Sequence, residues 1–118
     1  MEDTEAIKRC ALDYVEGWYE ENAGKMNQAL SPHLAKRRVV SDEEIWEVDK
    51  AWMIEATGNG RGRLDAPESG RKEITILDRT ATMASVKIVS EKFIDYVHLA
   101  KSQDCWMIVN VLWDYIPQ

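Results

Sequence analysis

Two residues carry side chains suited to proton transfer within apolar stretches, His98 and Tyr14. His98 lies inside an apolar run, residues 93–99, and its imidazole titrates near neutral pH. Asn110 lies in the next apolar run and is a candidate hydrogen-bond partner. The sequence leaves two interpretations of His98 open, a core histidine bonded to a neighbour or an acid–base or ligand-binding group.

The register of the last two apolar runs decides where His98 points. Pairing Ala100 with Trp106 puts His98 and Asn110 on one face of a sheet, whereas pairing Lys101 with Trp106 puts them on opposite faces. Either register is compatible with the sequence.

Tyr14 belongs to an amphipathic helix that we expect over residues 4–21. The apolar residues of this helix recur at helical spacing and define one buried face: Ile7, Ala11, Tyr14, Val15 and Trp18. Tyr14 is therefore a core or pocket-lining tyrosine, or a catalytic one.

Three tryptophans and two charged residues are further candidates. Trp18, Trp52 and Trp113 fit either a hydrophobic core or a stacking site for a flat ligand. Lys87 and Asp95 lie in expected strands, where a charge is costly unless it is paired or hydrated. We expect them to form a structural ion pair across the sheet in preference to a proton-transfer pair.

Several partners and cofactors are disfavoured by composition and spacing. The chain has 21 acidic and 15 basic residues and a net charge of −6, which repels nucleic acids. His33 and His98 form no metal-ligand pattern with the two cysteines, so we predict no metal and no cofactor. The Gly58-x-Gly60-x-Gly62 spacing follows an expected helix instead of opening one, which argues against a phosphate loop.

The location expected from the sequence is the cytoplasm. Neither cysteine lies in a C-x-x-C motif, and two free thiols are typical of an intracellular protein. The sequence shows neither a signal peptide nor an apolar run long enough to span a membrane.

Local signals predict the elements that position the candidates. Asn22 caps a short second helix, residues 23–30, which Ser31-Pro32 ends. Apolar residues alternate with period two in four expected strands: 72–79, 83–89, 93–99 and 106–113. Short turns join the last three strands, a pattern typical of an antiparallel meander.

The middle of the chain permits two interpretations. Residues 41–44 fit a capping box that starts a helix running to Thr57. Alternatively, this stretch holds a hairpin turn, residues 44–48 form a strand, and Asp49 caps a helix over residues 50–57. We favour the second, because it explains why Asp49 interrupts the apolar pattern.

Three short motifs accompany this order of elements. They are Tyr14–Trp18 on the first helix, Ser31-Pro32-His33 after the second, and the pair Phe93-x-Asp95-Tyr96-x-His98-Leu99 and Trp106-x-Ile108-Val109-Asn110. Order and motifs together resemble the nuclear-transport-factor-2-like (cystatin-like) superfamily. Within it the chain is most similar to small bacterial proteins labelled "putative lumazine-binding", which are related to the polyketide-cyclase-like branch.

The resemblance implies an α+β fold over a single domain, residues 1–118. A strongly bent antiparallel sheet would wrap around the N-terminal helices as a cone and leave a pocket between the sheet and the first helix. The pocket residues expected on this basis are Tyr14, Trp18, His33, Trp52, His98 and Asn110. In enzymes of this fold a tyrosine of the first helix can donate a hydrogen bond to a developing enolate, so Tyr14 and His98 are the catalytic candidates.

Members of the superfamily commonly pair through the convex sheet face, which implies a homodimer. The last strand supports this, because strict alternation makes both of its faces apolar: Trp106, Ile108 and Leu112 on one, Met107, Val109, Val111 and Trp113 on the other. A twin subunit is the simplest cover for the second face.

Three functional hypotheses follow. The first is a small-molecule-binding protein with an apolar, aromatic-lined pocket, and the ligand is not specified by the sequence. The second is an isomerase, dehydratase or cyclase that acts on a carbonyl compound by general acid–base chemistry. A third, a pure dimerisation module, requires a filled interior without a pocket.

Overall fold

The structure is a computed structural model that describes residues 2–117. Within this range the chain forms three α-helices, one 3-10 turn and six strands. In chain order they are α1 (Asp3–Glu20), α2 (Ala23–Ala29), β1 (Leu30–Ser41), β2 (Glu44–Val48), α3 (Lys50–Gly58), η1 (Pro67–Ser69), β3 (Glu73–Arg79), β4 (Met83–Val89), β5 (Phe93–Ser102) and β6 (Cys105–Tyr115).

The two N-terminal helices, α1 and α2, pack closely against each other. Asn22 caps α2, because its side chain accepts a hydrogen bond of 2.9 Å from the backbone N–H of Lys25. A Cβ atom at Gly17 would come within 2.9 Å of the backbone nitrogen of Met26. Glycine at this position therefore allows the backbones of α1 and α2 to approach each other.

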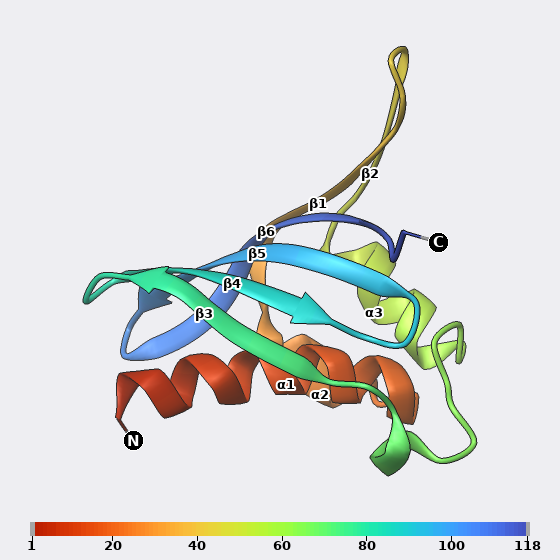
Figure 1. Ribbon diagram of the computed structural model, residues 1–118. Coiled ribbons are helices and arrows are strands. Elements are labelled where there is room, and N and C mark those ends of the chain that lie inside the picture. Colours follow the sequence, from red (N-terminus) through yellow and green to blue (C-terminus); the bar gives the residue numbers. More distant parts are fainter. Residues whose placement is uncertain (1, 118) are drawn as a thin grey trace.

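The middle of the chain adopts the second of the two interpretations. A hairpin joins β1 to β2, and Asp49 then caps α3 by accepting a hydrogen bond of 2.9 Å from the backbone N–H of Trp52. The hairpin extends well beyond the body of the sheet (Figure 1).

The six strands form one curved, unclosed sheet in the order β2-β1-β6-β5-β4-β3, in which only β1 and β6 run parallel. The sheet bends over α1 and α2, and α3 lies at one end (Figure 1). The predicted α+β class and the bent sheet around the N-terminal helices are thus confirmed. The parallel pairing was not foreseen, because turn signals report only on strands that are neighbours in sequence.

A β-bulge in β6 sets which side chains of this strand face the helices. Lys101 pairs with Trp106 near the turn, but His98 pairs with Asn110, so Val109 is an extra residue without a partner. Before Val109 the even-numbered side chains of β6 face the helices, and after it the odd-numbered ones do.

The bulge corrects the expected faces of β6. Buried Val111 and half-buried Trp113 lie on the same side as Trp106 and Ile108, and exposed Leu112 lies on the other. Strict alternation had separated Trp113 from Ile108. The outer face is consequently less apolar than the sequence predicted, since it carries Asn110.

The core fills the space between the helices and the concave face of the sheet. Its most deeply buried large apolar side chains come from the three helices and the strands: Ile7, Met26, Leu30, Met53, Val86, Ile88, Val97, Leu99 and Ile108. Burying one apolar side chain of this size stabilises the folded state by about 1.5–3 kcal/mol. No helix within residues 2–117 has the length and apolar composition needed to cross a membrane.

Candidate functional site

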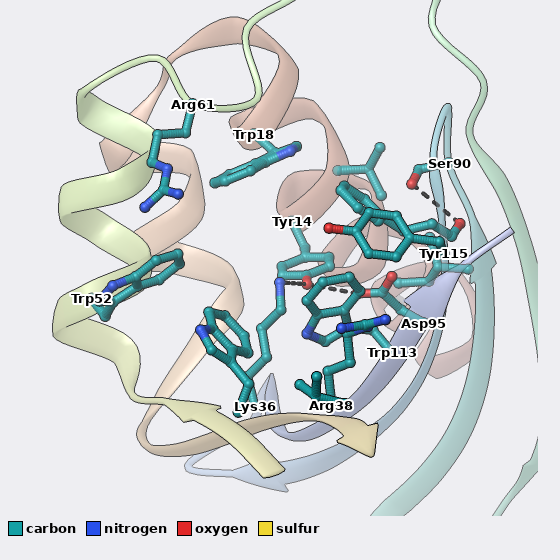
Figure 2. Close-up of a pocket in the computed structure, with 15 residues that line it drawn as sticks. Tyr14, Trp18, Lys36, Arg38, Trp52, Arg61, Ser90, Asp95, Trp113 and Tyr115 are labelled. Atoms are coloured by element: carbon teal, nitrogen blue, oxygen red, sulfur yellow. Dashed lines mark hydrogen bonds between the residues drawn. The ribbon is translucent and has the colours of Figure 1, made fainter. Parts of the chain in front are cut away.

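A cavity of about 340 Å³ lies between α1, the concave face of the sheet, α3 and the base of the β1–β2 hairpin. Its wall is mainly aromatic and includes four of the five tryptophans. The aromatic lining residues are Tyr14, Trp18, Trp46, Trp52, Phe93, Trp113 and Tyr115. Figure 2 shows them around a central space, with Trp18 and Trp52 across it from Tyr115.

The strand pattern explains how the floor of the cavity is built. Asp95 in β5 pairs with Ile88 in β4 and with Trp113 in β6, so these three side chains form one row on the inner face. Trp113 joins the row because of the bulge at Val109. On α1, Tyr14 and Trp18 are one turn apart and therefore face the same side.

A chain of two hydrogen bonds crosses this floor and joins three elements. Lys36 of β1 donates from Nζ to the hydroxyl oxygen of Tyr14 at 2.7 Å. The Tyr14 hydroxyl in turn donates to Oδ2 of Asp95 at 2.7 Å. Tyr14 and Asp95 are only 6% and 5% exposed, so this polar chain lies inside the protein.

Burial shifts the ionisation of all three groups. Loss of solvation raises the pKa of Asp95, and this rise is opposed by the Lys36 charge and the Tyr14 hydrogen bond. Loss of solvation lowers the pKa of Lys36 against the attraction of Asp95, and it raises the pKa of Tyr14 well above its usual value. Each shift favours the uncharged form, so the Lys36 and Asp95 charges rely on each other in place of water.

The cations of the wall lie over aromatic rings. Lys36 Nζ is 5.2, 5.9 and 5.6 Å from the ring centroids of Tyr14, Trp18 and Trp113. Arg38 lies over Trp113 and Tyr115, and Arg61 lies over Trp52 at 5.0 Å. These distances are typical of cation–π contacts.

The structure separates the predicted site residues into two groups. Tyr14, Trp18 and Trp52 line the cavity. His98 and Asn110 are exposed on the outer face, with Nδ1 of His98 and Nδ2 of Asn110 3.4 Å apart. His33 is exposed on β1 and does not line the cavity.

The position of His98 differs from the expectation for a physical reason. Buried Asp95, Val97 and Leu99 fix the inner face of β5, so the even-numbered His98 points outward. Its partner Asn110 follows it, because the bulge places that residue on the outer face too. Of the two catalytic candidates, only Tyr14 can contact a molecule held in this cavity.

Sequence reasoning missed the partners of Tyr14. Asp95 was assigned to Lys87, but Lys87 pairs with Tyr96 on the outer-facing positions. Lys36 was not among the candidates, although alternation puts it and Arg38 on one face of β1. The available signal was an acidic residue, Asp95, at an inward-facing position of an apolar strand.

No group of three or more His, Cys, Asp or Glu residues within residues 2–117 is placed to hold a metal ion. The chemistry that the cavity itself offers is that of an aromatic site with one ammonium, one phenol and one carboxylate in line.

Comparisons with known proteins define the class of this protein. An NTF2-like protein of unknown function from Shewanella baltica OS155 shares 19% identity and a TM-score of 0.76, with 98% of this chain and 95% of that chain covered. A second one, from Silicibacter pomeroyi DSS-3, shares 13% identity and a TM-score of 0.79, with 98% and 100% covered. A third, from Methylobacillus flagellatus KT, shares 18% identity and a TM-score of 0.78, with 98% and 93% covered. The class is thus the nuclear-transport-factor-2-like fold.

The family is more specific than the class. The model of the family described as "Putative lumazine-binding" matches residues 2–114, so the chain belongs to that family. The predicted superfamily and family are therefore confirmed. No curated protein matches the chain.

Proposed function

We propose that this protein binds a small, flat, partly aromatic molecule in the cavity beneath the sheet. The observation that carries the proposal is the cavity itself, about 340 Å³ with four tryptophans in its wall. Cavities of this size and apolar character are the usual sites of small ligands. The family description also names a ligand of this kind.

The rings of the wall hold one another in place. Trp46 packs edge to face against Trp52 at 5.2 Å and against Trp113 at 5.6 Å. Phe93 packs against Trp113 at 5.1 Å. Rings that are already fixed lose little entropy when a ligand binds, which favours affinity.

Tryptophan fluorescence provides the test. We expect flat heteroaromatic compounds to quench the emission, and a compound at a hundred times its Kd to stabilise the protein by about 2.7 kcal/mol. Trp52→Ala should weaken binding about tenfold through the lost stacking surface. Trp106→Phe is the matched control, since Trp106 lies outside the cavity wall. Equal affinities in both variants, or no quenching compound, would contradict the proposal.

A second candidate function rests on the Lys36–Tyr14–Asp95 chain. An isomerase, dehydratase or cyclase needs a base beside the carbon acid and donors for the enolate oxygen. Asp95 supplies a carboxylate and Lys36 supplies a donor. The Tyr14 hydroxyl, which donates to Asp95 in this structure, becomes a second donor if it turns towards the substrate. This set replaces the expected Tyr14 and His98 pair.

Deuterium exchange tests the enzymatic candidate. In D₂O the protein should catalyse the exchange of hydrogen for deuterium at the acidic carbon of β-tetralone. Mass spectrometry measures the deuterium that is taken up. Asp95→Asn should slow this exchange by about a hundredfold or more, as expected for loss of a general base. An unchanged rate in folded Asp95→Asn would exclude Asp95 as the base.

We also propose a homodimer formed through the outer sheet face, as its resemblance to the superfamily implies. Tyr96 and Leu112 are cross-strand neighbours on this face and are about half exposed, as is Met83 on β4. Sedimentation should show a dimer that Tyr96→Glu dissociates, and a monomeric wild-type protein would contradict this. A cytoplasmic location stays a prediction, supported by two free cysteines.

A further inference from the structure

We infer that the ligand of the cavity is an anion: a flat aromatic or conjugated molecule with one acidic oxygen group, recognised by Lys36 and Arg61. The inference rests on the proposed function and specifies the chemical class of the ligand.

Charge balance in the wall is the first argument. Lys36 and Asp95 compensate each other through Tyr14. Arg38 is compensated by Asp114, with 2.9 Å between Nε and Oδ1. Arg61 lines the cavity and forms no ion pair within residues 2–117, so the wall has one positive charge in excess although the whole chain is at −6. A bound anion completes the balance.

Hydrogen-bond donors without acceptors are the second argument. The ammonium of Lys36 makes one hydrogen bond, to Tyr14, and otherwise faces aromatic rings. The buried Nε1–H of Trp113, another residue of the wall, has no hydrogen-bond partner within residues 2–117. A buried donor without a partner costs about 1–3 kcal/mol. The Trp113 N–H is too deeply buried to reach a ligand, but the half-buried Lys36 ammonium lines the cavity and can donate to one. The ligand should therefore be rich in acceptors.

A cationic ligand fits poorly, even though aromatic cavities often bind cations. The protein's own cations already lie near the rings of Trp18, Trp52 and Trp113. A ligand cation would compete with them for the rings and would be repelled by like charges. Asp95 could attract it, but its Oδ2 already accepts from Tyr14.

The arrangement of the residues indicates how the anion lies. Figure 2 shows Lys36 rising from β1 towards Tyr14, with Trp52 and Arg61 on the side of the space formed by α3 and the loop that follows it. The Lys36 ammonium also lies 5.9 Å from the ring centroid of Trp18. We place the flat ring against Trp18 and Trp52. The acidic group then lies within reach of the Lys36 ammonium or the Arg61 guanidinium, whose planar fork suits a carboxylate.

Three probes of similar shape test the charge preference by titration calorimetry at pH 7. Naphthoate is an anion, naphthamide is neutral, and naphthylmethylammonium is a cation. We expect naphthoate to bind about tenfold more tightly than naphthamide, and the ammonium compound to bind most weakly. This preference should decrease as the salt concentration rises.

Two arginine variants test whether Arg61 causes the preference for the anionic probe. Arg61→Gln should reduce the advantage of naphthoate over naphthamide about threefold without changing the affinity for naphthamide. Arg63→Gln is the matched control, because Arg63 lies two residues further along the same loop and is exposed, as Arg61 is, but does not line the cavity. Lys36→Met, in preparations that are folded by circular dichroism, should remove the remaining preference.

The outcomes separate the two proposals. If naphthamide binds as tightly as naphthoate, or if Arg61→Gln behaves like Arg63→Gln, the anion inference is overturned while binding of the ring still supports the proposed function. If none of the three probes binds, the proposed function fails, and the inference fails with it.

Discussion

Lys36→Met is expected to lower the free energy of unfolding by about 3–5 kcal/mol at pH 7. Removing the ammonium leaves the carboxylate of Asp95 buried, 5% exposed, and the Tyr14 hydroxyl is then its one side-chain partner among residues 2–117. A buried charge that has lost its counter-charge must either remain unsolvated or take up a proton. Urea unfolding, followed by circular dichroism, measures the loss.

A triple variant is the control for this prediction. In Tyr14→Phe/Lys36→Met/Asp95→Leu the whole polar chain is replaced by apolar groups of similar size. Because burial disfavours the charged forms of Lys36 and Asp95 in the native protein, this variant should recover most of the stability lost in the single variant. If Lys36→Met costs less than about 0.5 kcal/mol, the charge on Lys36 contributes nothing to the fold.

The pH dependence of the Lys36→Met defect has a definite sign. The pKa of Asp95 is already raised above its ordinary value of 3.8, and it should rise further once Lys36 no longer opposes that shift. Folded Asp95 then binds its proton more tightly than the unfolded chain does. The contribution of Asp95 to the stability of the variant should thus be greatest below pH 3.8 and be lost as pH rises through the raised pKa. The difference from wild type should shrink on acidification, and a defect independent of pH would contradict this.

Trp113→Ala is the second large effect, with an expected loss of about 3 kcal/mol, the lower end for a large aromatic residue because Trp113 is half-buried. Its ring packs against Trp46, Phe93 and Tyr115, more aromatic partners than any other ring of the cavity has within residues 2–117. The Trp113 ring also lies 5.6 Å from the Lys36 ammonium, and its Nε1–H has no hydrogen-bond partner within residues 2–117. The variant should lose both stability and ligand binding.

Two substitutions control for position and size. Tyr115→Ala, two residues further along the same face and 53% exposed, should cost about 1 kcal/mol because less of its surface is buried. Trp113→Phe keeps a ring and should recover about half of the stability lost in Trp113→Ala. Thermal and urea unfolding measure each loss. If Tyr115→Ala costs as much as Trp113→Ala, the central role of Trp113 is wrong.

Much of the fold follows from local patterns in the sequence. Helical spacing of Ile7, Ala11 and Trp18 predicts α1, and Asp49 marks the start of α3. Alternating strands with short turns predict the meander, because these signals depend on residues that are neighbours in the chain. The family resemblance then supplied the bend of the sheet.

The candidate site was predictable only in part. Tyr14, Trp18 and Trp52 line the cavity, since each occupies the inward side of a helix. His98 and Asn110 lie outside it, because the inner face of β5 is set by Asp95, and one extra residue, Val109, changes the phase of β6. A bulge leaves no sign in the apolar pattern of this strand.

The amino-acid sequence alone determined the order of helices and strands, the family and the aromatic character of the interior, all of which arise from short-range spacing. Only the tertiary structure brought Lys36, Tyr14 and Asp95 together. Tyr14 and Asp95 are 81 positions apart, and Lys36 and Tyr14 are 22 apart, on a helix and two strands whose register is fixed by packing of the whole core. Contacts over such separations depend on which helix and strand faces pack against each other, and the spacing of residues along the chain does not determine that.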